Sequence, residues 1–258
     1  MKNTDVKKSI LDAAAPYLQG RTVKDLIIGI SLIGCELDDG SVGVSYVLRS
    51  GLPPECGAFG FARELIGKSA WEAARLFIDG TDNIQRSVGD CVLIAASQQL
   101  DGIEDDKKEA FFGIEPCPED TVGMIGLISP VAKSLEGKVG RLMVFDEGIS
   151  EYYGTEKVLP MRRQQELLPL CNKVIITGSS TINGSIDGLL SMCGNADEIV
   201  MVGSSTPMFA EGWKGTGVTA LAGSWWKNDR KEEIFRAISL GGGIKHLKPY
   251  AVQKIVRL

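Results

Sequence analysis

The sequence has few of the residues from which protein metal sites are usually built. It contains a single histidine, His246, and six cysteines that nowhere form a CxxC pair. Structural zinc sites take their ligands from closely spaced pairs of these residues, so the spacing excludes a zinc site of that kind. Nothing else in the sequence indicates secretion, and we interpret the cysteines as buried or incidental thiols rather than as disulfides.

Excess positive charge and long apolar runs are also missing. The chain carries 28 basic and 33 acidic residues, a net charge of −5, which predicts that nucleic acid is not a partner. The longest nearly apolar run, Leu26–Cys35, is about half the length that a membrane-spanning helix needs. Asp12 interrupts what would have to be the apolar core of a secretion signal. We therefore expect a cytoplasmic protein without a membrane partner.

Residues 1–100 have the pattern of a small α+β domain. Apolar residues recur on one stripe over Thr4–Leu18, which predicts an amphipathic helix with Thr4 as its cap. The runs Lys24–Leu37 and Ser41–Leu48, joined by the turn DDG, predict a hairpin-like pair of strands. From position 60 to position 100 the apolar spacing becomes helical.

Residues 121–258 have a different period. The short apolar runs VGMIGLI, RLMVF, KVIIT, EIVMV and VTALA do not alternate with polar residues, and helix-forming segments separate most of them. Such runs are typical of strands buried on both faces of a parallel sheet. YAVQKIVRL at the end predicts an edge strand. The charged and proline-rich residues 101–120 predict a connecting arm between the two regions.

Two segments rich in hydroxyl groups follow neighbouring apolar runs. In TGSSTINGSIDGLL, the stretch Gly178–Gly184 predicts a loop in which Asn183-Gly184 favours a left-handed backbone and Ser185 caps the next helix. The second segment is GSSTP, Gly203–Pro207. Ligands of open α/β sheets bind beyond the carboxyl ends of the strands, so these loops predict a site for a small polar ligand. A purely local role in capping and turning stays open.

The turn after the first apolar run of residues 121–258 leaves a cofactor-binding enzyme as the alternative to a ligand-binding protein. Gly126 ends the run VGMIG, but LISPVAKSL follows without the further glycines of a dinucleotide-binding turn. Asp146 and Glu147 stand about twenty residues later, where a ribose-binding acid would lie. A Rossmann-like enzyme that uses a dinucleotide or adenosyl cofactor therefore remains an alternative. ARELIGKS, which loosely fits a phosphate-binding loop, lies in a helical context and is not interpreted as one.

The quoted motifs are similar to those of a known family. VGMIGLISP, VFDEG, KVIITGSSTINGSIDGLL, IVMVGSSTPM and the late GGG resemble the C-terminal domain of the heavy-metal chelation family, once a domain of unknown function. The N-terminal half resembles its companion domain, which is similar to the N-terminal domain of enolase. The resemblance implies an α/β fold with an α+β domain over 1–100, an arm over 101–120 and a Rossmann-like, doubly wound parallel-sheet domain over 121–258.

The resemblance also implies a homodimer with a polar site in the cleft between the domains. The ligand-binding residues that it implies are Gly126, Pro130, Glu147, Thr177, Gly178, Thr181, Asn183, Ser205, Thr206 and Pro207. Among these, Glu147 would be the metal ligand. The chain departs from the family in GDCVLIAASQQ, where Ser97 or Gln98 stands in place of an asparagine.

Hydroxyls, amides and one carboxylate form a hard set of donors rather than a thiol-rich trap for a heavy metal. Two versions of metal binding follow. In the first, the metal arrives in a complex, and the loops grip its organic ligand. In the second, Glu147 binds the ion together with loop oxygens and water. The sequence names neither the metal nor a reaction.

Overall fold

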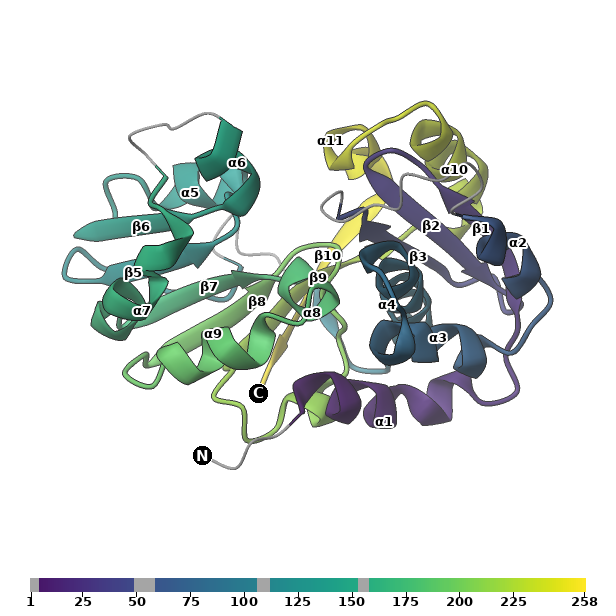
Figure 1. Cartoon of the computed structure of the whole chain (residues 1–258), viewed down its shortest axis with the longest axis horizontal. Helices are drawn as coiled ribbons and strands as arrows, with labels where there is room; N and C mark the ends of the chain where they lie inside the picture. Colours follow the sequence, from purple (N-terminus) through teal and green to yellow (C-terminus); the bar gives the residue numbers. More distant parts are fainter. Residues whose placement is uncertain (1–4, 49–58, 106–111, 153–157) are drawn as a thin grey trace.

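The computed structural model describes residues 5–48, 59–105, 112–152 and 158–258. They form two lobes, each with its own sheet (Figure 1). The first helix, α1 (Val6–Leu18), is capped by Asp5, whose side chain accepts a hydrogen bond from the backbone N–H of Lys8 at 3.1 Å. The predicted cap Thr4 lies outside the described residues. No helix in these ranges is long and apolar enough to cross a membrane.

The N-terminal lobe is an antiparallel sheet covered by helices. Its strands, in the order β1-β2-β3, are β1 (Val23–Ile28), β2 (Leu32–Leu37) and β3 (Val42–Tyr46). The helices that follow are α2 (Gly60–Leu65), α3 (Ala70–Asp79) and α4 (Asn83–Ser97). The first four residues of ARELIGKS lie in α2, as its helical context predicted.

The predicted strand Lys24–Leu37 is in fact two strands. The backbone N–H of Gly29 donates to the carbonyl of Leu32 at 2.9 Å, which turns the chain back on itself and leaves Ile30 exposed at the turn. A Cβ on Gly29 would lie 2.5 Å from the carbonyl oxygen of Ile238, so close packing from the other end of the chain requires glycine here. The apolar run continues through the turn, so the sequence does not show where one strand ends and the next begins.

The C-terminal lobe contains a seven-stranded sheet in the order β4-β10-β9-β8-β7-β5-β6. Its strands are β4 (Glu104–Asp105), β5 (Thr121–Ile125), β6 (Arg141–Phe145), β7 (Lys173–Thr177), β8 (Glu198–Val202), β9 (Ala220–Trp226) and β10 (Ala251–Arg257). The strands from β6 to β9 are parallel, as predicted, and β10 runs antiparallel beside β9. The short β4, from the predicted connecting arm, pairs with the outer side of β10.

The helices of this lobe connect the parallel strands. They are α5 (Ser129–Leu135), α6 (Glu147–Tyr152), α7 (Gln164–Leu167), α8 (Ser179–Ile182) and α9 (Ile186–Met192). Among the parallel strands β5 comes first in the sequence. The next strand, β6, pairs with one side of it, and β7 and the strands after it lie on the other side. The direction of winding therefore reverses between β5 and β7, which is the position where open α/β sheets bind ligands.

The two lobes exchange segments. After β9, helices α10 (Lys231–Ser239) and α11 (Ile244–Leu247) return to the N-terminal lobe (Figure 1). Gly34 of β2 faces Phe235 and Ile238 of α10, whereas Gly43 of β3 faces α4 on the opposite side of the sheet. Thus the N-terminal sheet is buried on both faces, which explains why every residue of β2 is buried.

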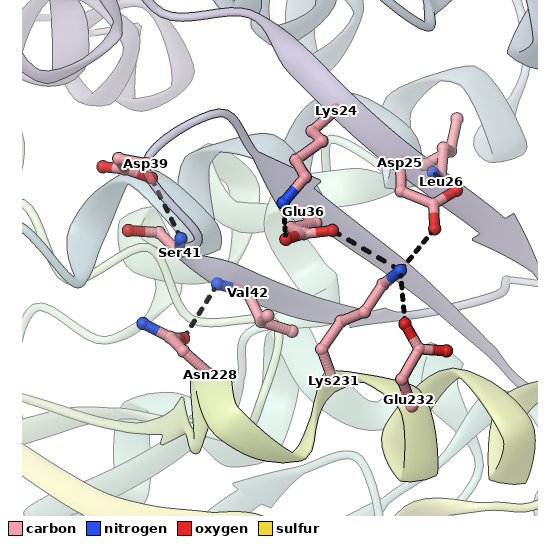
Figure 2. A network of polar contacts seen from close by, with 10 residues as sticks. All are labelled: Lys24, Asp25, Leu26, Glu36, Asp39, Ser41, Val42, Asn228, Lys231 and Glu232. Atoms are coloured by element: carbon pink, nitrogen blue, oxygen red, sulfur yellow. Dashed lines mark hydrogen bonds and ion pairs between the residues drawn. The ribbon is translucent and has the colours of Figure 1, made fainter.

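A polar network fastens α10 to this sheet (Figure 2). The ammonium of Lys231 lies 2.6 Å from Asp25 Oδ2 and 3.4 Å from Glu36 Oε2. Lys24 also pairs with Glu36, at 2.7 Å. Beside the network, Asn228 Oδ1 accepts the backbone N–H of Val42 at 3.2 Å. In return, the 3-10 helix η3 (Ala210–Trp213) packs against α1.

Candidate functional site

The predicted loop after β7 is partly helical. Ser179–Ile182 form the one-turn helix α8, which begins directly after Gly178. The hydroxyl of Thr181 donates to the carbonyl of Gly178 at 2.8 Å, and Thr177 Oγ1 lies 3.0 Å from Ser179 Oγ. Short hydroxyl side chains can satisfy nearby backbone groups in this way, so the predicted loop over Gly178–Gly184 was wrong for Ser179–Ile182, which are helical.

The turn that follows α8 agrees with the sequence in its backbone. Gly184 has φ +75°, as the Asn-Gly pair predicted. Ser185 takes the cap position of α9, but its side chain makes no capping hydrogen bond; instead its backbone N–H donates to Asn183 Oδ1 at 3.1 Å. Asn183 is exposed, and this hydrogen bond stabilises the turn.

The loops after β7 and β8 are in direct contact. A Cβ on Gly178 would lie 2.3 Å from the carbonyl oxygen of Ser205, so only glycine allows this approach. Ser205 and Thr206 are buried, and Pro207 accepts the indole N–H of Trp213 at 3.1 Å. The prediction that two hydroxyl-rich loops meet at adjacent strand ends is therefore confirmed.

The loop after β8 also contacts the N-terminal lobe. Ser205 Oγ lies 3.0 Å from Ser45 Oγ and accepts the backbone N–H of Tyr46 at 2.9 Å. The hydroxyl of Ser45 in turn donates to Asp90 Oδ2 on α4 at 2.5 Å. We call the residues Ser45, Asp90 and Ser205, with the buried hydroxyls beside them, the lobe junction.

Several buried polar atoms around the lobe junction make no hydrogen bond to any described residue. They are Asp90 Oδ1 and the hydroxyls of Ser87, Ser180, Ser204 and Thr206. Ser87 and Asp90 lie three residues apart on one face of α4, and α8, which carries Ser180, packs against that helix. Each unpaired buried group costs roughly 1–3 kcal/mol. The junction therefore gathers groups from both lobes that need a polar partner, either ligand or water.

At pH 7 the carboxyl group of Asp90 is mostly protonated and therefore neutral. Burial raises the pKa of this carboxyl to about 8, against the smaller opposing effects of the Ser45 hydrogen bond and the charge of Lys7. The pKa of Lys7, on α1, is lowered to about 8, first by burial and then by the charge of Arg86. A protonated Asp90 can both donate and accept hydrogen bonds.

Sequence reasoning missed both Ser45 and Asp90. Asp90 interrupts the apolar run VGDCVLIAA, and an isolated carboxylate inside an apolar helix is the signal that could have found it. Ser45 carries no such signal. Gln98, at the departure from the family pattern, also joins the lobes: its side-chain amide donates to the carbonyls of Val42 and Trp226.

The loop after β5 contacts both the end of β7 and the loop after β6. Gly126 has φ +83°, and a Cβ there would lie 2.9 Å from the Thr177 side chain. Asp146 accepts the backbone N–H groups of Leu127 at 2.8 Å and Ile149 at 3.0 Å. Both carboxylate oxygens of Asp146 thus bind backbone, whereas Glu147, the other acid predicted at the ribose position, is exposed.

The structure divides the predicted site residues into two groups. The buried residues pack where the loops meet; they are Gly178, Thr181, Ser205, Thr206 and Pro207. Gly126 and Thr177 adjoin them and are half-buried. The exposed residues lie on the loop surfaces; they are Pro130, Glu147 and Asn183.

Protein side chains alone do not assemble a metal site in the described ranges, where no group of three or more His, Cys, Asp or Glu could hold an ion. The described cysteines are free thiols, and Cys56 lies outside these ranges. Burial raises the pKa of Cys171 to about 11 and of Cys193 to about 12, and it raises that of Cys91 as well. The thiolate is the metal-binding form, so these buried cysteines are poor ligands.

Together these features define a two-lobed α/β protein with a buried polar junction between its lobes. Residues 110–257 match the family DUF364 and residues 11–97 match DUF4213, each described as "Putative heavy-metal chelation". The DUF364 model matches more than half of the chain, so the chain belongs to this family, as the motifs of its strand-end loops indicated. A search of curated proteins gives no match.

Two solved structures share the fold. The first is a protein of unknown function from the DUF364 family of Pyrococcus horikoshii, with a TM-score of 0.79 and 20% identity over 100% of both chains. The second is a DUF364 protein of unknown function from Desulfitobacterium hafniense, with a TM-score of 0.76 and 18% identity over 97% of this chain and 99% of that one. At these identities the likeness establishes the two-lobed α/β fold.

Proposed function

We propose that this protein binds a small oxygen-rich ligand, or a metal ion carried by such a ligand, between its lobes at the lobe junction. One observation carries the proposal: unpartnered buried polar atoms from both lobes, led by Asp90 Oδ1, gather beside the loops after β7 and β8. A ligand with several oxygen atoms would supply the missing hydrogen bonds. The buried hydroxyls and the neutral carboxyl of Asp90 can both donate and accept such bonds.

The donor chemistry favours a complexed metal over a bare ion. Without a cluster of charged ligands in the described ranges, the loops would grip the organic part of a chelate. In this arrangement Gly126 and Pro130 shape the first loop. The hydroxyl and amide side chains of the third and fourth loops contribute polar contacts; they are Thr177, Thr181, Asn183, Ser205 and Thr206. A bare ion would instead use the exposed Glu147.

The alternative of a dinucleotide or adenosyl cofactor finds no support. The turn after Gly126 has no further glycine before Gly137, and both carboxylate oxygens of Asp146 bind backbone N–H groups. A ribose hydroxyl at Asp146 would have to compete with those bonds. The family descriptions also name chelation rather than a cofactor-dependent reaction.

Native mass spectrometry tests the proposal. The protein should be untagged and purified without chelators, because a histidine tag would add metal ligands to a chain that has one histidine. We expect a bound mass equal to a metal plus an organic ligand, and the same spectra would report the expected homodimer. A spectrum of protein alone, together with no thermal shift from ferric citrate or nickel citrate, would contradict the proposal.

A paired substitution locates the binding. Thr206→Val removes a buried hydroxyl that has no partner in the described structure, so it should leave the unliganded protein at least as stable. The same change should weaken ligand binding by about tenfold, equivalent to 1.4 kcal/mol. Ser191→Ala, at an exposed hydroxyl on α9, is the matched control and should leave binding unchanged. Equal binding by the two variants would place the ligand elsewhere.

A further inference from the structure

A cavity lies between segments that are far apart in the sequence. Its volume is about 310 Å³, and it lies between the N-terminal sheet and the start of α11. The lining residues are Ser31, Tyr46, Val47, Gly243, Ile244, Lys245 and His246. The volume falls at the lower end of the range of small-molecule sites, roughly 300–1,000 Å³.

The lining combines apolar walls with positive charge. Val47, Ile244 and the ring of Tyr46 provide apolar surface, and Lys245 provides a cation. Among the residues that the structure describes, none in the lining is acidic. Burial raises the pKa of Tyr46, so its phenol stays a neutral hydrogen-bond donor. A mostly apolar pocket with a few such groups suits a small organic molecule, and the charge selects an anion.

The imidazole of His246 is held in place within this lining. The backbone N–H of Gly243 donates to Nδ1 at 3.1 Å, and the same ring nitrogen lies 3.3 Å from the carbonyl oxygen of Gly243. In the tautomer in which Nδ1 accepts the Gly243 N–H, the ring carries its proton on Nε2, which can then donate to an anion. The exposed Lys245 is the next residue along the chain. Two donors therefore line one small cavity from a single short segment.

From this geometry we infer that the cavity binds the anionic group, carboxylate or phosphate, of a small organic molecule. Lys245 and the Nε2–H of His246 would hold the anion, while Val47, Ile244 and the Tyr46 ring would pack against the organic part. This pocket is separate from the lobe junction and goes beyond the chelate-binding function. The two sites adjoin at Tyr46, which lines the pocket and whose backbone N–H donates to Ser205 Oγ in the lobe junction.

The single histidine makes the test direct, because the imidazole signals of the untagged protein all come from His246. Benzoate, phenyl phosphate and the neutral analogue benzamide would be titrated while the imidazole carbon-bound proton signals are followed by NMR at constant pH and ionic strength. We expect a saturable shift with a Kd on the order of 1 mM or tighter for at least one anion, and none for benzamide. Saturation by benzoate would indicate a carboxylate site, and saturation by phenyl phosphate would indicate a phosphate site.

A matched pair of variants separates specific binding from general charge. Lys245→Met should weaken the anion by about tenfold, because it removes a charge-assisted hydrogen bond. Lys133→Met, at an exposed lysine on α5 outside the pocket, should leave binding unchanged. The inference is overturned if neither anion saturates the shift, if benzamide binds equally well, or if Lys245→Met binds as the wild type does.

Discussion

Ser205 Oγ, at the carboxyl end of β8, lies 3.0 Å from Ser45 Oγ on β3, although the two residues are 160 positions apart in the chain. The contact joins the strand ends of one sheet to a strand of the other. Because Ser45 also bonds to the buried Asp90, the lobes meet through polar groups at the place where the sequence predicts a ligand.

Ser205→Ala should destabilise the protein by about 1–3 kcal/mol. The change removes the acceptor of the Tyr46 N–H and leaves that part-buried group without its partner. Urea unfolding gives the difference. Ser239→Ala, at an exposed hydroxyl, serves as the control and should change stability by less than about 0.5 kcal/mol. Similar values for the two variants would show that the lobe junction contributes little to stability.

Gly178→Ala and Gly188→Ala should change stability in opposite directions. At Gly178 a Cβ would meet the backbone carbonyl of Ser205 at 2.3 Å, and backbone cannot move aside cheaply, so we expect a loss of about 3 kcal/mol or more. Gly188, inside α9, has nothing within 4 Å of its Cβ position. Alanine there should add about 0.5–1 kcal/mol. Thermal and urea unfolding of the pair measure this; a mild effect at Gly178 would contradict the close contact of the loops.

Asp90 should make stability fall as the pH rises through the neutral range. Its folded pKa of about 8 lies far above the value near 3.8 of an unperturbed aspartate, so between these values the folded state holds a proton that the unfolded state has released. The unfolding free energy should therefore decrease by up to about 1.4 kcal/mol per pH unit from this group. Lys7 contributes in the opposite sense, but only above its folded pKa of about 8.

The corresponding measurement compares wild type with Asp90→Asn in urea between pH 5 and 7.5. Asparagine keeps the size and an acceptor for Ser45 but does not titrate in this range. We expect the variant to have the flatter stability profile. Parallel profiles would mean that Asp90 titrates normally in the folded protein.

Lys231→Met should loosen α10 from the N-terminal sheet. Burial lowers the pKa of Lys231, but its hydrogen bonds to Asp25 and Glu232 and the charge of Glu36 outweigh this effect, so the pKa is raised overall. We expect a loss of about 2 kcal/mol, since Glu36 would keep only Lys24 as its partner. Lys214→Met breaks an exposed pair with Glu211 and should cost less than about 1 kcal/mol. Equal losses would contradict an anchoring role.

Glu147→Gln tests the bare-ion version of metal binding. If Glu147 binds the ion directly, loss of its charge should weaken uptake of a free divalent metal by roughly tenfold or more, measured by calorimetry. Glu136→Gln, another exposed carboxylate, is the control. Unchanged uptake by Glu147→Gln would remove this residue as a ligand and leave only the complexed form.

The sequence by itself determined the parts of this protein that depend on neighbouring residues. Unalternating apolar runs predicted the strands from β5 to β9, because burial on both faces of a sheet imposes that composition along each strand. The Asn183-Gly184 pair predicted the left-handed turn, since that backbone conformation is a local property. The two hydroxyl-rich loops followed from the same strand assignments.

Only the tertiary structure decided which residues face one another. A buried residue must be apolar or hydrogen-bonded, but the spacing of buried positions along the chain does not show which residues contact one another. The contacts of Ser45 with Asp90 and Ser205 could therefore not be predicted from the sequence. For the same reason the sequence did not predict that α10 packs against the N-terminal sheet. An amphipathic helix requires an apolar surface to cover, and here the sheet of the other lobe supplies it.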